Sequence, residues 1–238
     1  MTRTGAQTVG VMGGLGPAAT CDFFARLLRE SKAARDQDHL RLLIDCNPRI
    51  PDRNEAIAGR GPSPGPALVE MARGLERAGA DFLVLVCNAA HHWESDIRAA
   101  VSIPFLSMVA STVEECLALR PKPKCVGVLA ADACLGADLY GRALAEHGVR
   151  SLSLDAARQA RFMELLYRIK SDDRSAALRD EMREQARSLH ARGAEAILSG
   201  CTEIPLVLRA EDWPAPCVSS TDVLVARTIA FARAEPRP

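Results

Sequence analysis

The sequence has few aromatic residues, no net charge and no long apolar run, and each absence excludes a class of protein. Phe, Trp and Tyr make up 4% of the 238 residues, which leaves little material for stacking on nucleic-acid bases. The 30 basic residues balance the 30 acidic ones, so no basic field favours nucleic acid or an anionic membrane. No apolar segment approaches the roughly 20 residues that span a bilayer. We therefore expect a small-molecule partner, no nucleic acid and no membrane.

The eight cysteines lack both the spacing of a zinc site and the context of a disulfide framework. No C-x-x-C pair occurs, so we predict no metal site. The N-terminal MTRTGAQTVGVMGG leads directly into a strand pattern, without the apolar core and cleavage site of a signal peptide. This pattern predicts a cytoplasmic protein, in which thiols stay reduced.

Short apolar segments alternate with longer segments of helical periodicity. The alternation, with nearly continuous apolar strands, predicts an α/β fold with parallel sheets covered on both faces. The expected strands are Thr8–Met12, Leu40–Asp45, Phe82–Cys87, Lys124–Leu129, Ser151–Leu154 and Ala196–Ser199. The expected helices are Ala18–Ala33, Gly65–Ala78, His92–Ala100, Leu135–Glu146, Ser175–Ala191 and Thr221–Ala232.

The chain repeats itself at about half its length. VGVM from Val9 resembles VGVL from Val126, and GAD from Gly79 resembles GAE from Gly193, at offsets of 117 and 114 residues. Internal similarity at this distance predicts a duplicated α/β unit. We expect residues 1–118 plus 217–238 to form the first half, with the C-terminal helix returning to it, and residues 119–216 to form the second.

Cys87 and Cys201 end equivalent strands, each eight residues after the glycine of its repeat. Ligands bind beyond the carboxyl ends of parallel strands, where backbone amides and helix dipoles favour a thiolate. Each cysteine precedes a polar residue, Asn88 or Thr202, that can donate hydrogen bonds. If the halves face each other, one thiolate can remove a proton while the other thiol delivers one to the opposite face. The matched pair favours this chemistry over two buried packing cysteines.

Five segments in order along the chain resemble the cofactor-independent aspartate/glutamate racemase superfamily, and most closely its aspartate racemase branch. They are VGVMGGLGPAAT from Val9, NPRIPDR from Asn47, CNAAHHW from Cys87, VGVLAAD from Val126 and GCTEIPL from Gly200. The resemblance implies two pseudo-symmetric Rossmann-like α/β/α halves with mainly parallel sheets and an active site between them. It also implies a homodimer, no pyridoxal phosphate or metal, and paired acid/base roles for Cys87 and Cys201.

The same resemblance implies that Arg53 and Lys170 bind substrate carboxylates. A guanidinium can bind a carboxylate bidentately, which supports Arg53, whereas a solvated role for Lys170 is equally expected. The glycine run after the first strand does not spell the dinucleotide motif G-x-G-x-x-G. The backbone amides of Gly13 and Gly14 could instead receive a substrate carboxylate, and a plain tight turn is the alternative.

Residues that follow the two thiols are expected to line the substrate pocket, namely Asn88, Ala89, Thr202 and Glu203. Glu203 could steer the protonation of Cys201 or only stabilise a helix N-terminus. His91 could tune Cys87 or only pack, and His92 is expected to point outward. The stretch Cys46–Pro66 has no regular pattern, and both a lid and a surface loop fit it. Arg49 is expected to be structural or exposed, and the expected packing cysteines are Cys21, Cys46, Cys116, Cys125 and Cys217.

The chain departs from the aspartate racemase pattern where that branch has hydroxyl groups. The branch usually reads C-N-T-A-H at the first cysteine and A-T-D-G-T after the central strand. This chain has Ala89 in the first motif and Ala131, Ala133 and Cys134 in the second. The lost hydroxyls weaken the case for aspartate itself and leave the two thiols intact. We predict an isomerase, a cofactor-independent amino-acid racemase acting on aspartate, glutamate or a related substrate.

Other reactions of the same superfamily are alternatives, namely hydantoin racemisation, maleate isomerisation and arylmalonate-type decarboxylation. A decarboxylase of that type needs one cysteine, so the pair speaks against it, whereas maleate isomerisation also uses two. A non-catalytic small-ligand sensor is a further alternative, and it predicts thermal stabilisation by a ligand without turnover.

Overall fold

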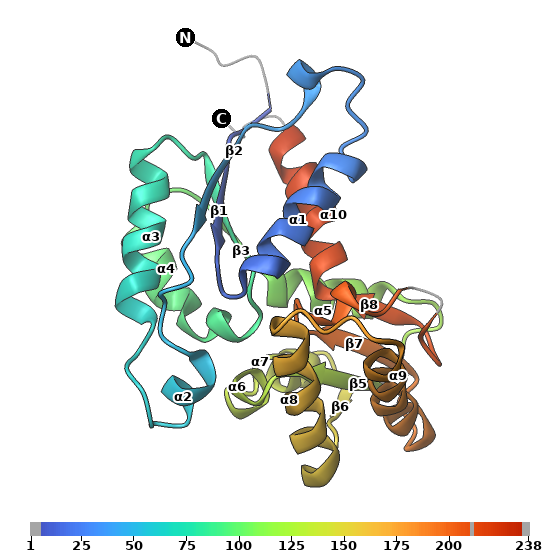
Figure 1. The fold of residues 1–238 in the computed structure, drawn as a ribbon. Coiled ribbons are helices and arrows are strands. Elements are labelled where there is room, and N and C mark those ends of the chain that lie inside the picture. Colours follow the sequence, from blue (N-terminus) through green and yellow to red (C-terminus); the bar gives the residue numbers. More distant parts are fainter. Residues whose placement is uncertain (1–5, 210–211, 235–238) are drawn as a thin grey trace.

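Two parallel four-stranded sheets with the same strand order form the framework of the protein (Figure 1). The computed structural model describes residues 6–209 and 212–234. The order is β2-β1-β3-β4 in one sheet and β6-β5-β7-β8 in the other, and every neighbouring pair is parallel. The predicted α/β fold of two similar halves is therefore confirmed. The strands are β1 (Val9–Gly13), β2 (Leu42–Cys46), β3 (Phe82–Leu85), β4 (Phe105–Leu106), β5 (Cys125–Ala130), β6 (Arg150–Leu152), β7 (Ala196–Gly200) and β8 (Cys217–Ser219).

Helices cover both sheets, and several of them begin after a residue whose side chain caps the first turn. Ser107, Asp155, Ser175 and Ser219 each accept a hydrogen bond from an amide in the first turn of the helix that follows. The helices are α1 (Pro17–Glu30), α2 (Arg53–Ile57), α3 (Gly65–Arg77), α4 (Glu94–Ala100), α5 (Met108–Ala118), α6 (Asp132–Gly136), α7 (Leu139–Ala145), α8 (Ala156–Lys170), α9 (Ala176–Ala191) and α10 (Ser220–Arg233), with the short 3-10 turns η1 (Asp36–Asp38), η2 (Ala89–Trp93) and η3 (Ile204–Leu206).

Two predicted segments differ from the structure. The expected helix Leu135–Glu146 is divided into α6 and α7, because Asp138 adopts a left-handed conformation with φ of 49° between them. The stretch Cys46–Pro66 is not wholly irregular, since Asp52 accepts hydrogen bonds from the amides of Asn54 and Glu55 and so begins α2.

The two halves exchange a helix. Helix α5 follows the first sheet, but its Val113 packs in the same apolar cluster as Val126 of the second sheet. Helix α10 follows the second sheet, but its Leu224 packs with Val11 and Val84 of the first. In Figure 1, α10 lies beside α1, and the two are in contact. This crossing places the carboxyl ends of β3 and β7 on either side of one interface.

The final strand bears on how the halves are divided. Residues Cys217–Ser219 form β8, which pairs with β7 in the second sheet. We therefore propose a division in which the second half extends to residue 219 and α10 alone returns to the first. None of the helices in the described part of the chain has the length and apolar character needed to cross a membrane.

Candidate active site

Cys87 and Cys201 occupy equivalent places in the two halves. Cys87 lies two residues beyond the end of β3, and Cys201 directly follows β7. Their exposures are 7% and 8%, so both thiols are buried to the same degree. Strands β3 and β7 are themselves fully buried. The rigid interior of each half thus holds one thiol at the interface between the halves.

Both thiols line a single cavity of about 30 Å³. A space of that size has room for little more than ordered water. Eight of the residues expected from the sequence line it, and they come from both halves: Cys87, Asn88, Ala89, Arg53, Lys170, Cys201, Thr202 and Glu203. The structure adds Leu15, Asn54, Ala131, Cys134 and Gly200.

Cys201, Glu203 and Lys170 form a short chain of interacting groups. The thiol of Cys201 donates a hydrogen bond to Oε2 of Glu203 at 2.9 Å, and Oε1 lies 3.6 Å from Nζ of Lys170. Burial raises the pKa of Cys201 well above its ordinary value, and the charge of Glu203 raises it further. Burial opposes the charge of Lys170, but Glu203 and the two thiols hold its pKa above the ordinary value. Cys201 is therefore a thiol at neutral pH, because burial and Glu203 outweigh the strand-end amides expected to favour a thiolate.

The backbone at Cys87 is held by His91. Nδ1 of His91 donates to the carbonyl oxygen of Cys87 at 2.8 Å, and Nε2 accepts from the amide of Met108 at 3.0 Å. Burial lowers the pKa of His91, so the ring is neutral. His91 thus joins the backbone of Cys87 to the first amide of α5, as a packing residue would. His92 is exposed, as predicted.

Arg53 is placed at the cavity, but its guanidinium is already engaged. It donates to the carbonyl oxygens of Leu15, Ile50 and Pro51 at 2.9, 3.4 and 3.0 Å. These bonds join the glycine turn after β1 to the loop before α2. Three of its five N–H groups are used in this way, and the other two stay available for a carboxylate.

The glycine turn after β1 is closely packed, and its Gly14 amide is already engaged. The amide of Gly14 donates to Oγ1 of Thr20 at 2.9 Å, and Gly14 has φ of 91°. A side chain at Gly13 would meet Thr20, and one at Gly14 would meet the backbone of Asn47. Neither glycine lines the thiol cavity. Close packing against Thr20 and Asn47 requires glycine at both positions, which favours the tight-turn alternative.

Asn54 joins the two halves at the edge of the cavity. Its Oδ1 accepts from the amide of Ala133 at 2.9 Å, and Ala133 lies in the first turn of α6. The residues that replace the usual hydroxyls lie here, because Ala131 and Cys134 line the cavity beside Ala89. Burial and the neighbouring Cys87 raise the pKa of Cys134 to about 12, so its thiol is protonated. This wall of the cavity is therefore mainly apolar.

An outer cavity of about 360 Å³ shares Leu15, Arg53, Lys170 and Glu203 with the thiol cavity. Its other walls come mostly from the glycine turn and the start of α1. The four shared residues therefore separate the thiols from a space large enough for part of a small ligand. Gly14 lines only this outer space.

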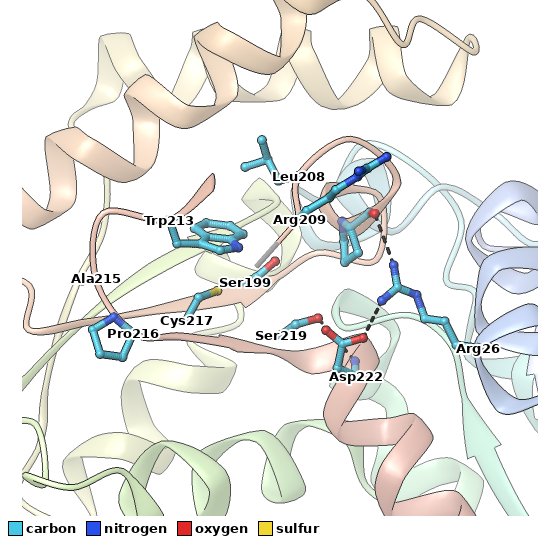
Figure 2. Close-up of a pocket in the computed structure, with 11 residues that line it drawn as sticks. Arg26, Ser199, Leu208, Arg209, Trp213, Ala215, Pro216, Cys217, Ser219 and Asp222 are labelled. Atoms are coloured by element: carbon cyan, nitrogen blue, oxygen red, sulfur yellow. Dashed lines mark hydrogen bonds and ion pairs between the residues drawn. The ribbon is translucent and has the colours of Figure 1, made fainter. Parts of the chain in front are cut away.

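A larger cavity of about 530 Å³ lies between α1, β8 and the segment after Cys201, and it contains neither thiol (Figure 2). Arg26 crosses one side of it, with Nη1 2.5 Å from Oδ1 of Asp222 and Nη2 donating to the carbonyl oxygen of Pro205 at 3.2 Å. Figure 2 shows Trp213 above Ser199 on the other side. Arg26 thus joins helix α1 to Pro205, in the segment that follows Cys201.

Among the described residues, no group of three or more His, Cys, Asp or Glu side chains could hold a metal ion. Two cysteines expected to pack, Cys21 and Cys46, are exposed, because they lie on the outer side of α1 and at the end of the edge strand β2. Cys116 and Cys125 are buried, and Cys217 is partly buried.

Comparison with known protein families identifies one family whose model covers the candidate site and both sheets. The model of the Asp/Glu/Hydantoin racemase family matches residues 12–228. The chain belongs to this family. Because racemases are isomerases, the enzyme class predicted from the sequence is confirmed.

Individual relatives match along nearly the whole chain. The broad specificity amino-acid racemase RacX of Bacillus subtilis (strain 168) is 27% identical over 93% of this chain and 96% of its own length. The structure of Picrophilus torridus aspartate racemase superposes with a TM-score of 0.84 and 28% identity, over 95% of this chain and 94% of that one. An aspartate racemase homologue from Pyrococcus horikoshii OT3 has a TM-score of 0.76 at 21% identity, covering 96% and 100%. The last of these shows the fold alone.

Two residues at the cavity, Leu15 and Asn54, could not be assigned from the residues themselves. Asn54 directly follows the NPRIPDR segment, which was the one available signal. Leu15 lies in the glycine run and reaches the cavity only because the turn closes on Arg53.

Proposed function

We propose that the protein is a cofactor-independent amino-acid racemase in which Cys87 and Cys201 form a two-base pair. The observation that carries the proposal is that equivalent strand ends bring both thiols to one cavity. Membership of the racemase family supports the reaction class. The proposed substrates are aspartate, glutamate or a related amino acid.

The protonation states suggest how a turnover begins. Cys201 is a thiol, so in the proposed mechanism Cys87 is the base, and its sulfur takes the α-proton while the Cα–H bond breaks. The thiol of Cys201 then gives its proton to the opposite face of the carbanion, which inverts the configuration. The enzyme is left with Cys87 protonated and Cys201 as thiolate. The reverse reaction starts from this state. The enzyme regains its first state when Cys87 releases its proton to water and Cys201 takes one up, a transfer that Glu203, with Oε2 2.9 Å from the sulfur, relays.

The carbanion requires positive charge or hydrogen-bond donors near the α-carboxylate. The two unused N–H groups of Arg53, the ammonium of Lys170 and backbone amides after Cys87 and Cys201 are the candidates at this cavity. Since about 30 Å³ cannot hold an amino acid, we propose that the substrate also uses the outer cavity beyond Arg53 and Lys170.

The substrate's side chain is left open by the relatives, of which one is named an aspartate racemase and one a broad specificity amino-acid racemase. The apolar wall formed by Ala89, Ala131 and Cys134 lacks the hydroxyls of the aspartate branch. We therefore propose that the protein accepts amino acids beyond aspartate, with fewer hydrogen bonds to each.

A panel of D- and L-amino acids, incubated with purified protein in D2O, tests the proposal. Chiral chromatography reports inversion and mass spectrometry reports deuterium at Cα, and prior dialysis against a chelator tests independence from metals. The expected result is inversion, with deuterium in the product and protium in the recovered substrate. Absence of both inversion and exchange with every amino acid would overturn the proposal. Turnover of maleate, followed by absorbance, would replace it with isomerisation of a dicarboxylate.

A homodimer and a cytoplasmic location are parts of the same proposal. Phe24 and Leu28, both on α1, are large apolar side chains with exposures of 38% and 41%. Their position on one helix supports contact between two copies of the chain. Light scattering of the wild type and a Phe24→Glu variant tests it, and a monomeric wild type would overturn it.

A further inference from the structure

Tyr140 lies in α7, in the second half of the chain, and contacts both thiol segments. Its side chain is 2% exposed. The hydroxyl donates a hydrogen bond to Oδ1 of Asn88, the residue after Cys87. The ring lies against Gly200, the residue before Cys201. One buried side chain thus joins the residue that follows one thiol to the residue that precedes the other.

The contact with Gly200 leaves no room for a side chain there. A Cβ atom at position 200 would lie 2.9 Å from Cε2 of Tyr140, well inside van der Waals contact. The ring therefore packs directly on the backbone at the end of β7. A shift of the ring would press on the peptide that carries Cys201.

The contact with Asn88 is part of a buried network. Nδ2 of Asn88 donates to Oγ of Ser220 at 3.0 Å, and Ser220 begins α10. Both ends of the Asn88 amide are thus held, by Tyr140 from the second half and by α10 from the crossing helix. Asn88 cannot turn without breaking a buried hydrogen bond, which fixes the backbone next to Cys87.

We propose that Tyr140 is a positioning residue that fixes Cys87 and Cys201 relative to each other across the interface. Its hydroxyl holds the backbone at Cys87 through Asn88, and its ring packs on the backbone at Gly200, next to Cys201. The proposal rests on the proposed two-thiol function, because only a reaction that needs both thiols at once depends on their separation. In such a reaction a misplacement of about 1 Å lowers the rate severely.

The state of the hydroxyl fits this role. Burial raises the pKa of Tyr140 well above its ordinary value, and the nearby thiol of Cys134 acts in the same direction. The phenol therefore stays protonated, and its hydrogen bond to Asn88 persists over the whole working pH range. Asn88 receives a donor that does not titrate.

A tyrosine that only fills the core would give the same stability loss on mutation, so the test needs a readout tied to the thiols. Tyr140→Phe keeps the ring and removes the hydroxyl. Thr228→Val is the matched control, because it removes a buried hydroxyl that donates to the carbonyl of Leu224 in α10, away from both thiols. Each variant is assayed for kcat, for KM and for the pH dependence of iodoacetamide alkylation at each cysteine, resolved by mass spectrometry.

For Tyr140→Phe we expect kcat to fall by roughly tenfold to a hundredfold with KM within about twofold, since one buried hydrogen-bond partner is lost. The alkylation profile of Cys87 should shift while that of Cys201 stays, and Thr228→Val should change neither. A Tyr140→Phe protein with wild-type kcat and wild-type alkylation would overturn the proposal. Because alkylation needs no substrate, a wild type without racemase activity would refute the proposed function and leave this test standing.

The ring contact is tested separately by a double-mutant cycle. Gly200→Ala should shift the alkylation profile of Cys201. The shift should be smaller in a Tyr140→Leu background, where the atom at 2.9 Å is gone and only Leu198 Cδ2 at 3.1 Å and Ala130 Cβ at 3.3 Å still crowd the new methyl group. Equal shifts in the two backgrounds would show that the alanine acts without the ring and would overturn this part of the proposal.

Discussion

Replacing Glu203 by glutamine separates the two effects that its carboxylate has on Cys201. Glu203→Gln keeps the volume and removes the charge 2.9 Å from the sulfur. Because Glu203 holds the pKa of Cys201 above its ordinary value, the variant should form the thiolate at lower pH. The same variant removes the group that relays a proton back to Cys201 between turnovers. Alkylation of Cys201 should therefore become faster while racemisation becomes slower.

The size of the effect follows from Coulomb's law. Two unit charges 2.9 Å apart repel by about 1.4 kcal/mol even at the dielectric constant of water, and by more at a buried site. That lower bound corresponds to an increase of about tenfold in the thiolate fraction at fixed pH, and so in the alkylation rate at Cys201. Loss of a general acid–base partner lowers kcat, by about a hundredfold in typical enzymes.

The assay follows iodoacetamide incorporation at each cysteine by mass spectrometry between pH 6 and pH 9, beside racemisation rates. Glu55→Gln is the control, because Glu55 is a neighbouring acid on α2 that pairs with Arg60 and lines neither cavity. Alkylation of Cys201 at the wild-type rate in Glu203→Gln would refute the reasoning.

Two further predictions concern stability. His91→Leu should lower the free energy of unfolding by about 1–3 kcal/mol for each of the two backbone groups it leaves unpaired, at Cys87 and Met108. Burial lowers the pKa of His91, so below about pH 6.5 only the unfolded chain takes up this proton and the wild type loses stability. The variant should lose less stability between pH 7.5 and pH 5.5, as measured by urea denaturation. Burial raises the pKa of Cys116 to about 12. Above the unfolded value of about 8.5, only the unfolded chain releases this proton, so the free energy of unfolding falls by about 1.4 kcal/mol per pH unit. Cys116→Ala should remove this contribution to the loss of stability at alkaline pH. If the free energy of unfolding falls equally steeply with pH in the variant and the wild type between pH 8.5 and 9.5, the prediction is wrong.

The regular part of the fold was predictable because its signals are local. Each central strand is a short apolar run, and all six predicted strands lie within two residues of observed ones. The edge strands β4 and β8 were missed because two or three residues carry no pattern. Helices α5 and α8 were both missed. For α5 the reason is that its sequence, MVASTVEECLA, is apolar or small on most sides. That composition is explained by its place between the two sheets, where it meets both α7 and α10.

The candidate site was predictable where residues neighbour a thiol in the sequence, as Asn88, Thr202 and Glu203 do. It was not predictable where distant segments meet. The carbonyls that engage Arg53 and the contact of Tyr140 with Asn88 depend on tertiary packing that no local pattern encodes. The glycine turn shows the same limit, because only the position of Thr20 tells that the Gly14 amide is already engaged.

The most direct test of the two-thiol account compares three serine variants of cysteines that line the same cavity. Cys87→Ser and Cys201→Ser each remove a proposed acid/base group, and Cys134→Ser changes a neighbouring thiol without one. On the best substrate of the panel, the account predicts that either of the first two lowers kcat by at least about a hundredfold, while Cys134→Ser stays within about tenfold of the wild type. Near wild-type racemisation by Cys87→Ser or Cys201→Ser would contradict it.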